Sequence, residues 1–188
     1  AKSIQLQADS LIPTPLAESK IDWAMLGGSP VSTDKVEILL SSVPNSFIEK
    51  RLDLLESIGL NVIAFEPDSM AVSRSNVPAE MREPALVVDV GSMSTDLVIT
   101  VDGVPHLTRG ISTGMAAVIQ AAAQNLNIEK QQAEQFVFKF GLSKEKLEGQ
   151  IYNAIISTVD LLVNDIEKSI KFFQTRYPNK KLERIIMT

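Results

Sequence analysis

A single carboxylate, Asp89, lies in an apolar run and is followed at once by glycine and hydroxyl-bearing residues. The sequence over 85–97 reads ALVVDVGSMSTDL. An ionised carboxylate in an apolar strand loses several kcal/mol by desolvation unless it is paired, hydrated or beside a cation. The stretch 91–95 can curl its backbone and present N–H and O–H donors to an anion. The pattern therefore predicts a loop that binds phosphate, with a carboxylate at its start.

A structural role for Asp89 explains the same residues. An aspartate before a loop commonly accepts hydrogen bonds from backbone N–H groups a few residues further on. Ser92 and Ser94 stand at suitable spacing for this. Spacing alone does not separate this loop-capping role from ligand binding, so both interpretations stay open at this point.

The elements that hold this loop are predicted to be β-strands. Residues 85–90 are almost wholly apolar, and two β-patterned runs, 97–101 and 104–111, are separated by Asp102-Gly103. An Asp-Gly pair between such runs is a strong signal of a two-residue hairpin turn. We therefore expect a strand, a tight loop and then a β-hairpin.

The chain before residue 76 is predicted to form a small unit of strands and helices. Strands are expected over 21–27, 36–43 and 61–65, and helices over 3–11, 45–58 and 66–74. Asn45 is expected to cap the second of these helices and Gly59 to end it. Trp23 is expected to be a core residue.

Three helices and a strand are predicted after the hairpin. The expected ranges are 113–127, 128–140 and 143–177 for the helices and 183–188 for the strand. Ser112 or Thr113 is expected to cap the first helix and Ser143 the third. The third helix has apolar residues at steps of three and four, which favours a helix lying on its own domain over a coiled coil.

Composition excludes several classes of function. The 188 residues are 45% apolar and carry 18 basic against 23 acidic side chains, not gathered in long runs of one sign, so nucleic acid is not an expected partner. The absence of cysteine excludes disulfides and thiolate metal sites and fits a reducing cytoplasm. The lone His106 is expected on a strand surface and not as a metal ligand. No signal peptide and no apolar run of about 20 residues is found, so direct membrane insertion is not expected.

The run 89–97, DVGSMSTDL, resembles the second phosphate motif of the actin-like ATPases, most closely the PilM-type proteins of type IV pilus assembly and more distantly the FtsA-type cell-division proteins. Three further stretches agree with this family. Residues 12–16 with 21–23 resemble the entry to its inserted subdomain 1C, and 54–60 with 66–71 resemble its helix, strand and connecting helix. Residues 108–114 resemble the strand and helix start after the phosphate hairpin.

The resemblance implies an α/β protein with two lobes and an incomplete actin-like fold. Residues 1–75 would form an α+β unit like subdomain 1C with a connecting helix, and 76–84 a linker. Residues 85–188 would form actin-like domain 2, a lobe of the ribonuclease H-like kind that is truncated at the adenosine motif. Family members also carry a first phosphate loop before 1C, so a complete nucleotide pocket is not expected in this chain.

The resemblance also implies a nucleotide site and its residues. The expected cofactor-binding residues are Asp89, Gly91, Ser92, Ser94, Thr95, Gly114 and Glu134. Asp89 would position Mg²⁺ through water, and the hydroxyls would contact the phosphates of ATP. Two positions depart from the family, which usually has a lysine where Val137 stands and a second glycine where Met115 stands.

Two of the acidic residues also have plainer interpretations. Asp96 would support the loop or be a solvated hairpin charge, and Glu134 would be only a helix-surface acid. No catalytic base is expected in this chain. Slow hydrolysis of ATP is expected, if at all, only in a full-length family member that contains this sequence.

The function implied by the family is that of a cytoplasmic scaffold of type IV pilus assembly. Such a protein would dock the cytoplasmic tail of a PilN-like inner-membrane protein, form homo-oligomers and stay peripheral to the inner membrane through that partner. The apolar strand 38–43 would take part in peptide docking or, equally, be an ordinary core strand. The alternatives are a fragment of an FtsA-like cell-division protein or of a sugar or acetate kinase, which share the phosphate loop.

Overall fold

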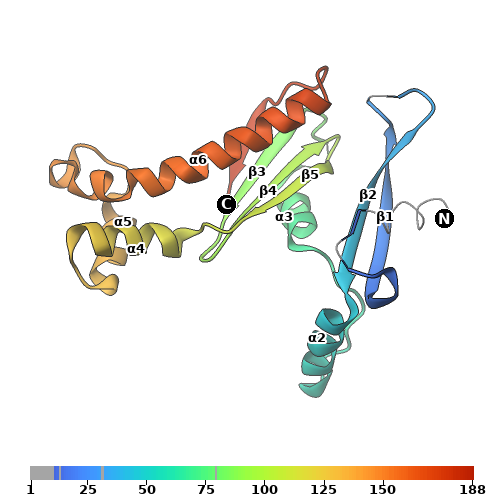
Figure 1. Ribbon diagram of the computed structural model, residues 1–188, viewed down its shortest axis with the longest axis horizontal. Coiled ribbons are helices and arrows are strands. Elements are labelled where there is room, and N and C mark those ends of the chain that lie inside the picture. The colour runs from blue at the N-terminus through green and yellow to red at the C-terminus, as the bar shows by residue number, and fades with distance from the viewer. Residues whose placement is uncertain (1–10, 13, 31, 79) are drawn as a thin grey trace. The chain divides into compact units, whose positions relative to one another are not determined.

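The computed structural model describes residues 11–12, 14–30, 32–78 and 80–188, and the chain divides into two units, Ala1–Pro67 and Asp68–Thr188 (Figure 1). The helix predicted over 3–11 falls on residues that lie, except for Leu11, outside the described part.

A two-stranded antiparallel sheet forms the centre of the first unit. Strands β1 (Ser19–Gly28) and β2 (Val36–Pro44) confirm two of the predicted strands, and they follow a short 3₁₀ turn, η1 (Leu16–Glu18). Side chains alternate between the two faces of a strand. Trp23 pairs with Leu40 and Met25 with Ile38, so one face of this sheet is apolar.

Helix α2 (Asn45–Ser57) follows β2 directly and ends as predicted. The N–H of Gly59, in the left-handed region at φ +87°, donates to the carbonyl of Glu56, and the N–H of Leu60 donates to that of Leu55. The predicted cap is wrong, because Asn45 is already the first helical residue. Its side-chain Nδ2 instead donates to the carbonyl of Ala17.

Two further predictions for the first unit are wrong. Trp23 is 43% exposed and therefore not a core residue, since a two-stranded sheet buries a side chain only where another element covers it. Residues 61–65 form no strand, and Ile63 is 92% exposed. Their alternation is that of a strand, but among the described residues no other strand pairs with them.

A four-stranded sheet forms the centre of the second unit. Its strands are β3 (Ala85–Val90), β4 (Thr95–Val101), β5 (Val104–Ile111) and β6 (Arg184–Met187), in the order β5-β4-β3-β6. The hairpins are antiparallel, and β6 runs parallel to β3. Asp102 and Gly103 both have positive φ, at 52° and 74°, as a two-residue hairpin turn of the predicted kind requires.

Helices cover both faces of this sheet. On one face Leu86, Leu97 and Ile99 pack under the long helix α6 (Gln150–Arg176), around the fully buried Phe173. On the other face Val87 and Val98 pack beneath helix α3 (Asp68–Asn76) and the segment after it. We call this second side the α3 face. Because α3 rests on the sheet, the chain divides before it, and not at the linker expected over 76–84.

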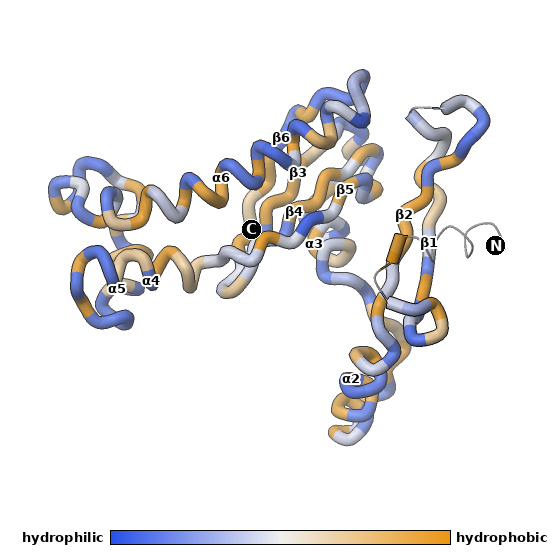
Figure 2. The backbone as a smooth tube through the Cα atoms, viewed as in Figure 1, coloured by the Kyte–Doolittle hydropathy of each residue, from blue (hydrophilic) through white to orange (hydrophobic). Residues whose placement is uncertain are grey.

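A helical part with its own core extends from the sheet (Figure 1). Helices α4 (Met115–Leu126) and α5 (Lys130–Phe140) pack with the first half of α6. Apolar residues recur between polar ones along α6 (Figure 2). No helix among the described residues is both long enough and apolar enough to cross a bilayer.

The predicted helix caps in this part are wrong. Gly114 is the residue before α4, and no side-chain cap joins its first turn. Helix α6 begins at Gln150 and not near Ser143, because η2 (Lys146–Gly149) precedes it. Leu147 and Glu148 have φ of 47° and 53°, and Gly149 has φ of 73°, so a right-handed helix cannot run through them.

Replacing Phe173 by alanine is expected to destabilise the second unit by about 3 to 5 kcal/mol, because it leaves a cavity beneath α6. The neighbouring Phe172 is 61% exposed and supplies a matched control, for which we expect a loss below about 1 kcal/mol. Urea unfolding followed by circular dichroism measures both. Equal losses for the two variants would contradict the assigned packing of α6.

Candidate functional site

The predicted phosphate loop is the tight connection between β3 and β4, residues 91–94. Ser92, Met93 and Ser94 are exposed at its tip, and Gly91 is half-buried. Asp89 and Asp96 flank it as directly paired residues of the two strands. Ser92 and Ser94 are thus open to a ligand in the part of the molecule where the sequence predicted one.

The backbone of this loop is bonded to the first turn of α4. The N–H of Met115 donates to the carbonyl of Gly91 at 2.9 Å, and the N–H of Ala116 donates to the carbonyl of Ser92 at 2.8 Å. The first N–H groups of a helix have no partner within the helix and need one outside it. Here the loop itself supplies that partner, so these two N–H groups are not available to an anion.

Gly114 permits this close approach. A Cβ at Gly114 would lie 2.5 Å from the carbonyl oxygen of Gly91 and 2.6 Å from that of Ser92. Its φ of −132° is open to any residue, so the requirement for glycine comes from space and not from conformation. The predicted cofactor-binding residue Gly114 is therefore buried behind the loop, where its role is packing.

Thr95 holds the loop from the same side. Its hydroxyl donates to the carbonyl of Thr113 at 2.8 Å, and its side chain is fully buried. The sequence predicted that Thr95 contacts phosphate, and the structure places this hydroxyl instead beneath the loop. The sequence carries little signal for this supporting role, because a motif does not distinguish a buried threonine from one that binds a ligand.

Asp89 and Asp96 both lie on the α3 face, as the alternation of β3 and β4 requires. Burial first, and then the negative charges of Asp68 and Asp89, raise the pKa of Asp96 above its ordinary value. Negative charge therefore gathers beside the loop. A cation in this region would offset it.

The loop-capping interpretation of Asp89 finds no support. Among the hydrogen bonds of the described residues, none joins the Asp89 carboxylate to Ser92 or Ser94. The same residues contain no group of three or more carboxylates or histidines arranged to hold a metal ion. One carboxylate with phosphate oxygens and waters is the donor set that Mg²⁺ commonly takes, so Asp89 fits this ion in the presence of a phosphate ligand.

The remaining candidates lie away from these contacts. Glu134 is exposed on α5, and no hydrogen bond in the described part of the chain joins it to the loop. His106 packs edge-on against Tyr177, and its Nδ1 lies 2.9 Å from the carbonyl of Val104, so it serves the strand surface as expected.

One positioning residue of the site was missed from the sequence. A Cβ at Gly110 would lie 3.3 Å from Oδ1 of Asp96, so this glycine of β5 leaves room for that carboxylate. The strand register, with Gly110 opposite Asp96, is the signal that could have found it.

Comparison with known proteins gives a family and a fold. The family model described as type IV pilus assembly protein PilM matches residues 2–188. The solved PilM-PilN type IV pilus biogenesis complex is similar with a TM-score of 0.74 at 21% identity, over 99% of this chain and 54% of that one. The chain therefore spans about half the length of that relative.

Two structures of MreB5 of Spiroplasma citri share the fold. The form bound to AMPPNP has a TM-score of 0.57 at 16% identity, over 69% of this chain and 48% of that one. The form bound to ADP has a TM-score of 0.50 at 18% identity, over 66% and 48%. These likenesses confirm the α/β, actin-like fold expected from the sequence.

Replacing Gly114 by alanine is expected to separate the loop from α4, because the new methyl group would overlap two backbone carbonyls. We expect the amide protons of Met115 and Ala116 to lose most of their protection from hydrogen exchange, with a stability loss of about 1 to 3 kcal/mol. A Cβ at Gly28 meets nothing within 4 Å, so Gly28→Ala is the control. Unchanged protection in Gly114→Ala would refute the packing role of this glycine.

Proposed function

The chain belongs to the family of type IV pilus assembly proteins PilM, and from this we propose that it acts as a cytoplasmic scaffold for the cytoplasmic tail of a PilN-type inner-membrane protein. The match over residues 2–188 is the observation that carries the proposal. It favours this function over an FtsA-type or sugar-kinase fragment. The similar solved structure is of a PilM-PilN complex, which supports the choice of partner.

The first unit supplies the docking surface in this proposal. Trp23 and Met25, 43% and 62% exposed, lie on the same apolar face of the β1–β2 sheet as Leu40. Among the described strands β2 pairs only with β1, so its outer edge is open. An extended peptide adds to such an edge by backbone hydrogen bonds and places alternate side chains against the face.

Two buried polar atoms near the end of β2 lack a hydrogen-bond partner among the described residues. Oγ of Ser42 and Oδ1 of Asn45 are buried and have no hydrogen-bond partner within the described part of the chain. Buried polar groups in completed structures are nearly always bonded. The hydrogen bonds at the end of β2 are therefore incomplete among the described residues.

Tail binding has a built-in reporter, since Trp23 is the single tryptophan of the chain. Titration with a synthetic peptide of the PilN cytoplasmic tail is expected to shift Trp23 emission to shorter wavelength. Met25→Glu, on the apolar face, is expected to weaken binding at least about tenfold, because it buries an unpaired charge. Ala24→Glu places the same charge on the opposite face of β1 and is expected to change binding less than about twofold. Equal effects of the two variants, or no binding at all, would count against this surface.

We also propose that the phosphate loop takes part in binding ATP with Mg²⁺ in the full-length protein. Ser92 and Ser94 would contact the phosphates, and Asp89 would hold the ion through water. Thr95 and Gly114 would support the loop from behind. The MreB5 structures contain AMPPNP and ADP, which supports a nucleotide for this fold.

Calorimetric titration of ATP with Mg²⁺ tests this part, using a full-length PilM protein that includes this sequence. Asp89→Ala is expected to weaken binding at least about tenfold, since it removes the carboxylate beside the cation. Asp160→Ala, an exposed residue of α6, is the matched control and should bind like the unchanged protein. If Asp89→Ala also binds unchanged, the assignment of the loop fails while the tail-docking proposal stands.

A further inference from the structure

The C-terminal end of α6 concentrates positive charge in a chain that is acidic as a whole. The net charge of the chain is −5. Between residues 168 and 184, however, there are six basic side chains and a single acidic one, Glu183. A third of all lysines and arginines thus lie in this short stretch, and they are drawn from the helix, the turn after it and the start of β6.

The outward face of α6 also exposes apolar side chains beside these charges. Phe173 and Ser169 are buried against the sheet side, whereas Phe172 and Leu161 are 61% and 66% exposed. Lys168 lies four residues before Phe172 and seven after Leu161, which puts these three side chains on one face of the helix, and Lys171 follows Lys168 at a step of three. We call Lys168, Lys171, Phe172, Lys180, Lys181 and Arg184 the basic end of α6.

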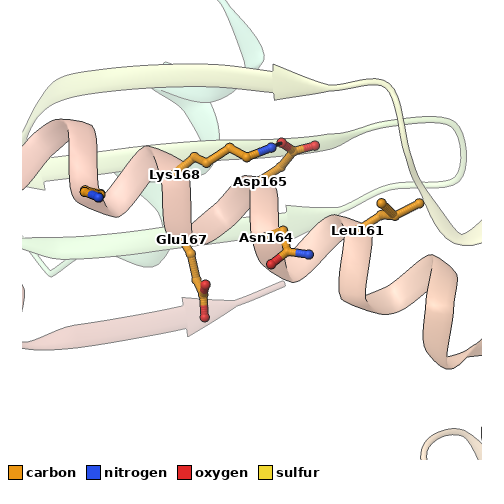
Figure 3. A pocket seen from close by; sticks show the side chains of 6 residues that line it. Leu161, Asn164, Asp165, Glu167 and Lys168 are labelled. Atoms are coloured by element: carbon orange, nitrogen blue, oxygen red, sulfur yellow. Dashed lines mark hydrogen bonds and ion pairs between the residues drawn. The ribbon is translucent and has the colours of Figure 1, made fainter.

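A shallow depression of about 360 Å³ follows this face, and its lining side chains all come from α6 (Figure 3). The lining residues are Leu161, Asn164, Asp165, Glu167, Lys168 and Lys171. Asp165 is engaged, since its Oδ1 lies 3.0 Å from Nζ of Lys168 and 3.6 Å from the Arg109 guanidinium. The face is thus open along one helix and has no deep pocket to receive an anchoring side chain.

Three lysines at this end are exposed and stand outside the salt bridges of the described residues. In the part of the chain that the structure describes, no salt bridge involves Lys171, Lys180 or Lys181, and all three are exposed. Lysine is a point charge on a flexible stem, which responds to the density of charge on a partner more than to its shape. An exposed phenylalanine among such lysines suits a surface that is anionic at its boundary and apolar just beneath.

We propose that the basic end of α6 is a contact surface for anionic phospholipid headgroups. The lysines attract the negative surface of the bilayer, and Phe172 enters the boundary between headgroups and acyl chains. The contact is weak and reversible, since few charges and one aromatic ring take part. It extends the proposed scaffold function by a second attachment beside the membrane partner, and it does not depend on the docking of that partner's tail.

Co-sedimentation with vesicles tests the proposal directly on the 188-residue chain. Vesicles of phosphatidylcholine with about one third phosphatidylglycerol are expected to bind the protein, and pure phosphatidylcholine vesicles are not. Lys171→Glu with Lys181→Glu is expected to weaken binding at least about tenfold, and Phe172→Ser several-fold. Raising the salt concentration should weaken binding in the same direction.

The matched control reverses two exposed lysines elsewhere in the second unit. Lys130→Glu with Lys146→Glu makes the same change in net charge and is expected to bind like the unchanged protein. Equal losses in both double variants would show attraction by net charge alone and overturn the proposal. Absence of binding to the anionic vesicles would overturn it too, and an acidic protein partner would then be the better explanation of the basic end. Tail-peptide binding, measured without vesicles, reports separately on the proposed function.

Discussion

The contact between the β3–β4 loop and the first turn of α4 is the constraint on which the second unit depends. Two loop carbonyls accept the N–H groups of Met115 and Ala116, and only a residue without a side chain at position 114 lets the backbones meet. The same contact holds the β3–β4 loop in place and fixes where α4, the first helix of the helical part, begins. A glycine that the motif suggests as a ligand contact is therefore needed first for the fold.

Much of the second unit could be predicted from local sequence. Asp102-Gly103 predicted the hairpin, the almost wholly apolar run 85–90 predicted β3, and the spacing along α6 predicted its buried stripe. The first residues of the helices were harder to predict. Ser112, Thr113 and Ser143 are residue types that cap helices, but none of them stands directly before a helix. Backbone geometry at Gly114 and the left-handed run at 147–149 decide those starts, and neither is visible in residue type.

The first unit was less predictable for a different physical reason. Trp23 and residues 61–65 have the character of buried strand residues, yet their burial depends on what lies against them. A sequence records that a segment is suited to a sheet but not whether a neighbour is present. At the loop, likewise, the motif predicted that Asp89, Ser92, Ser94 and Thr95 share one site, whereas the position of the Thr95 hydroxyl behind the loop is known only from its hydrogen bond to Thr113.

Helix α6 belongs to two hydrophobic cores at once. Ile151 and Ile155 near its start pack with α4 and α5, and Phe173 near its end packs with the sheet. A rigid rod of 27 residues, about 40 Å long, cannot bend to suit one core without disturbing the other. The sheet and the helical part should therefore unfold together in one cooperative transition. A displacement of the helical part should likewise be transmitted along α6 to the sheet.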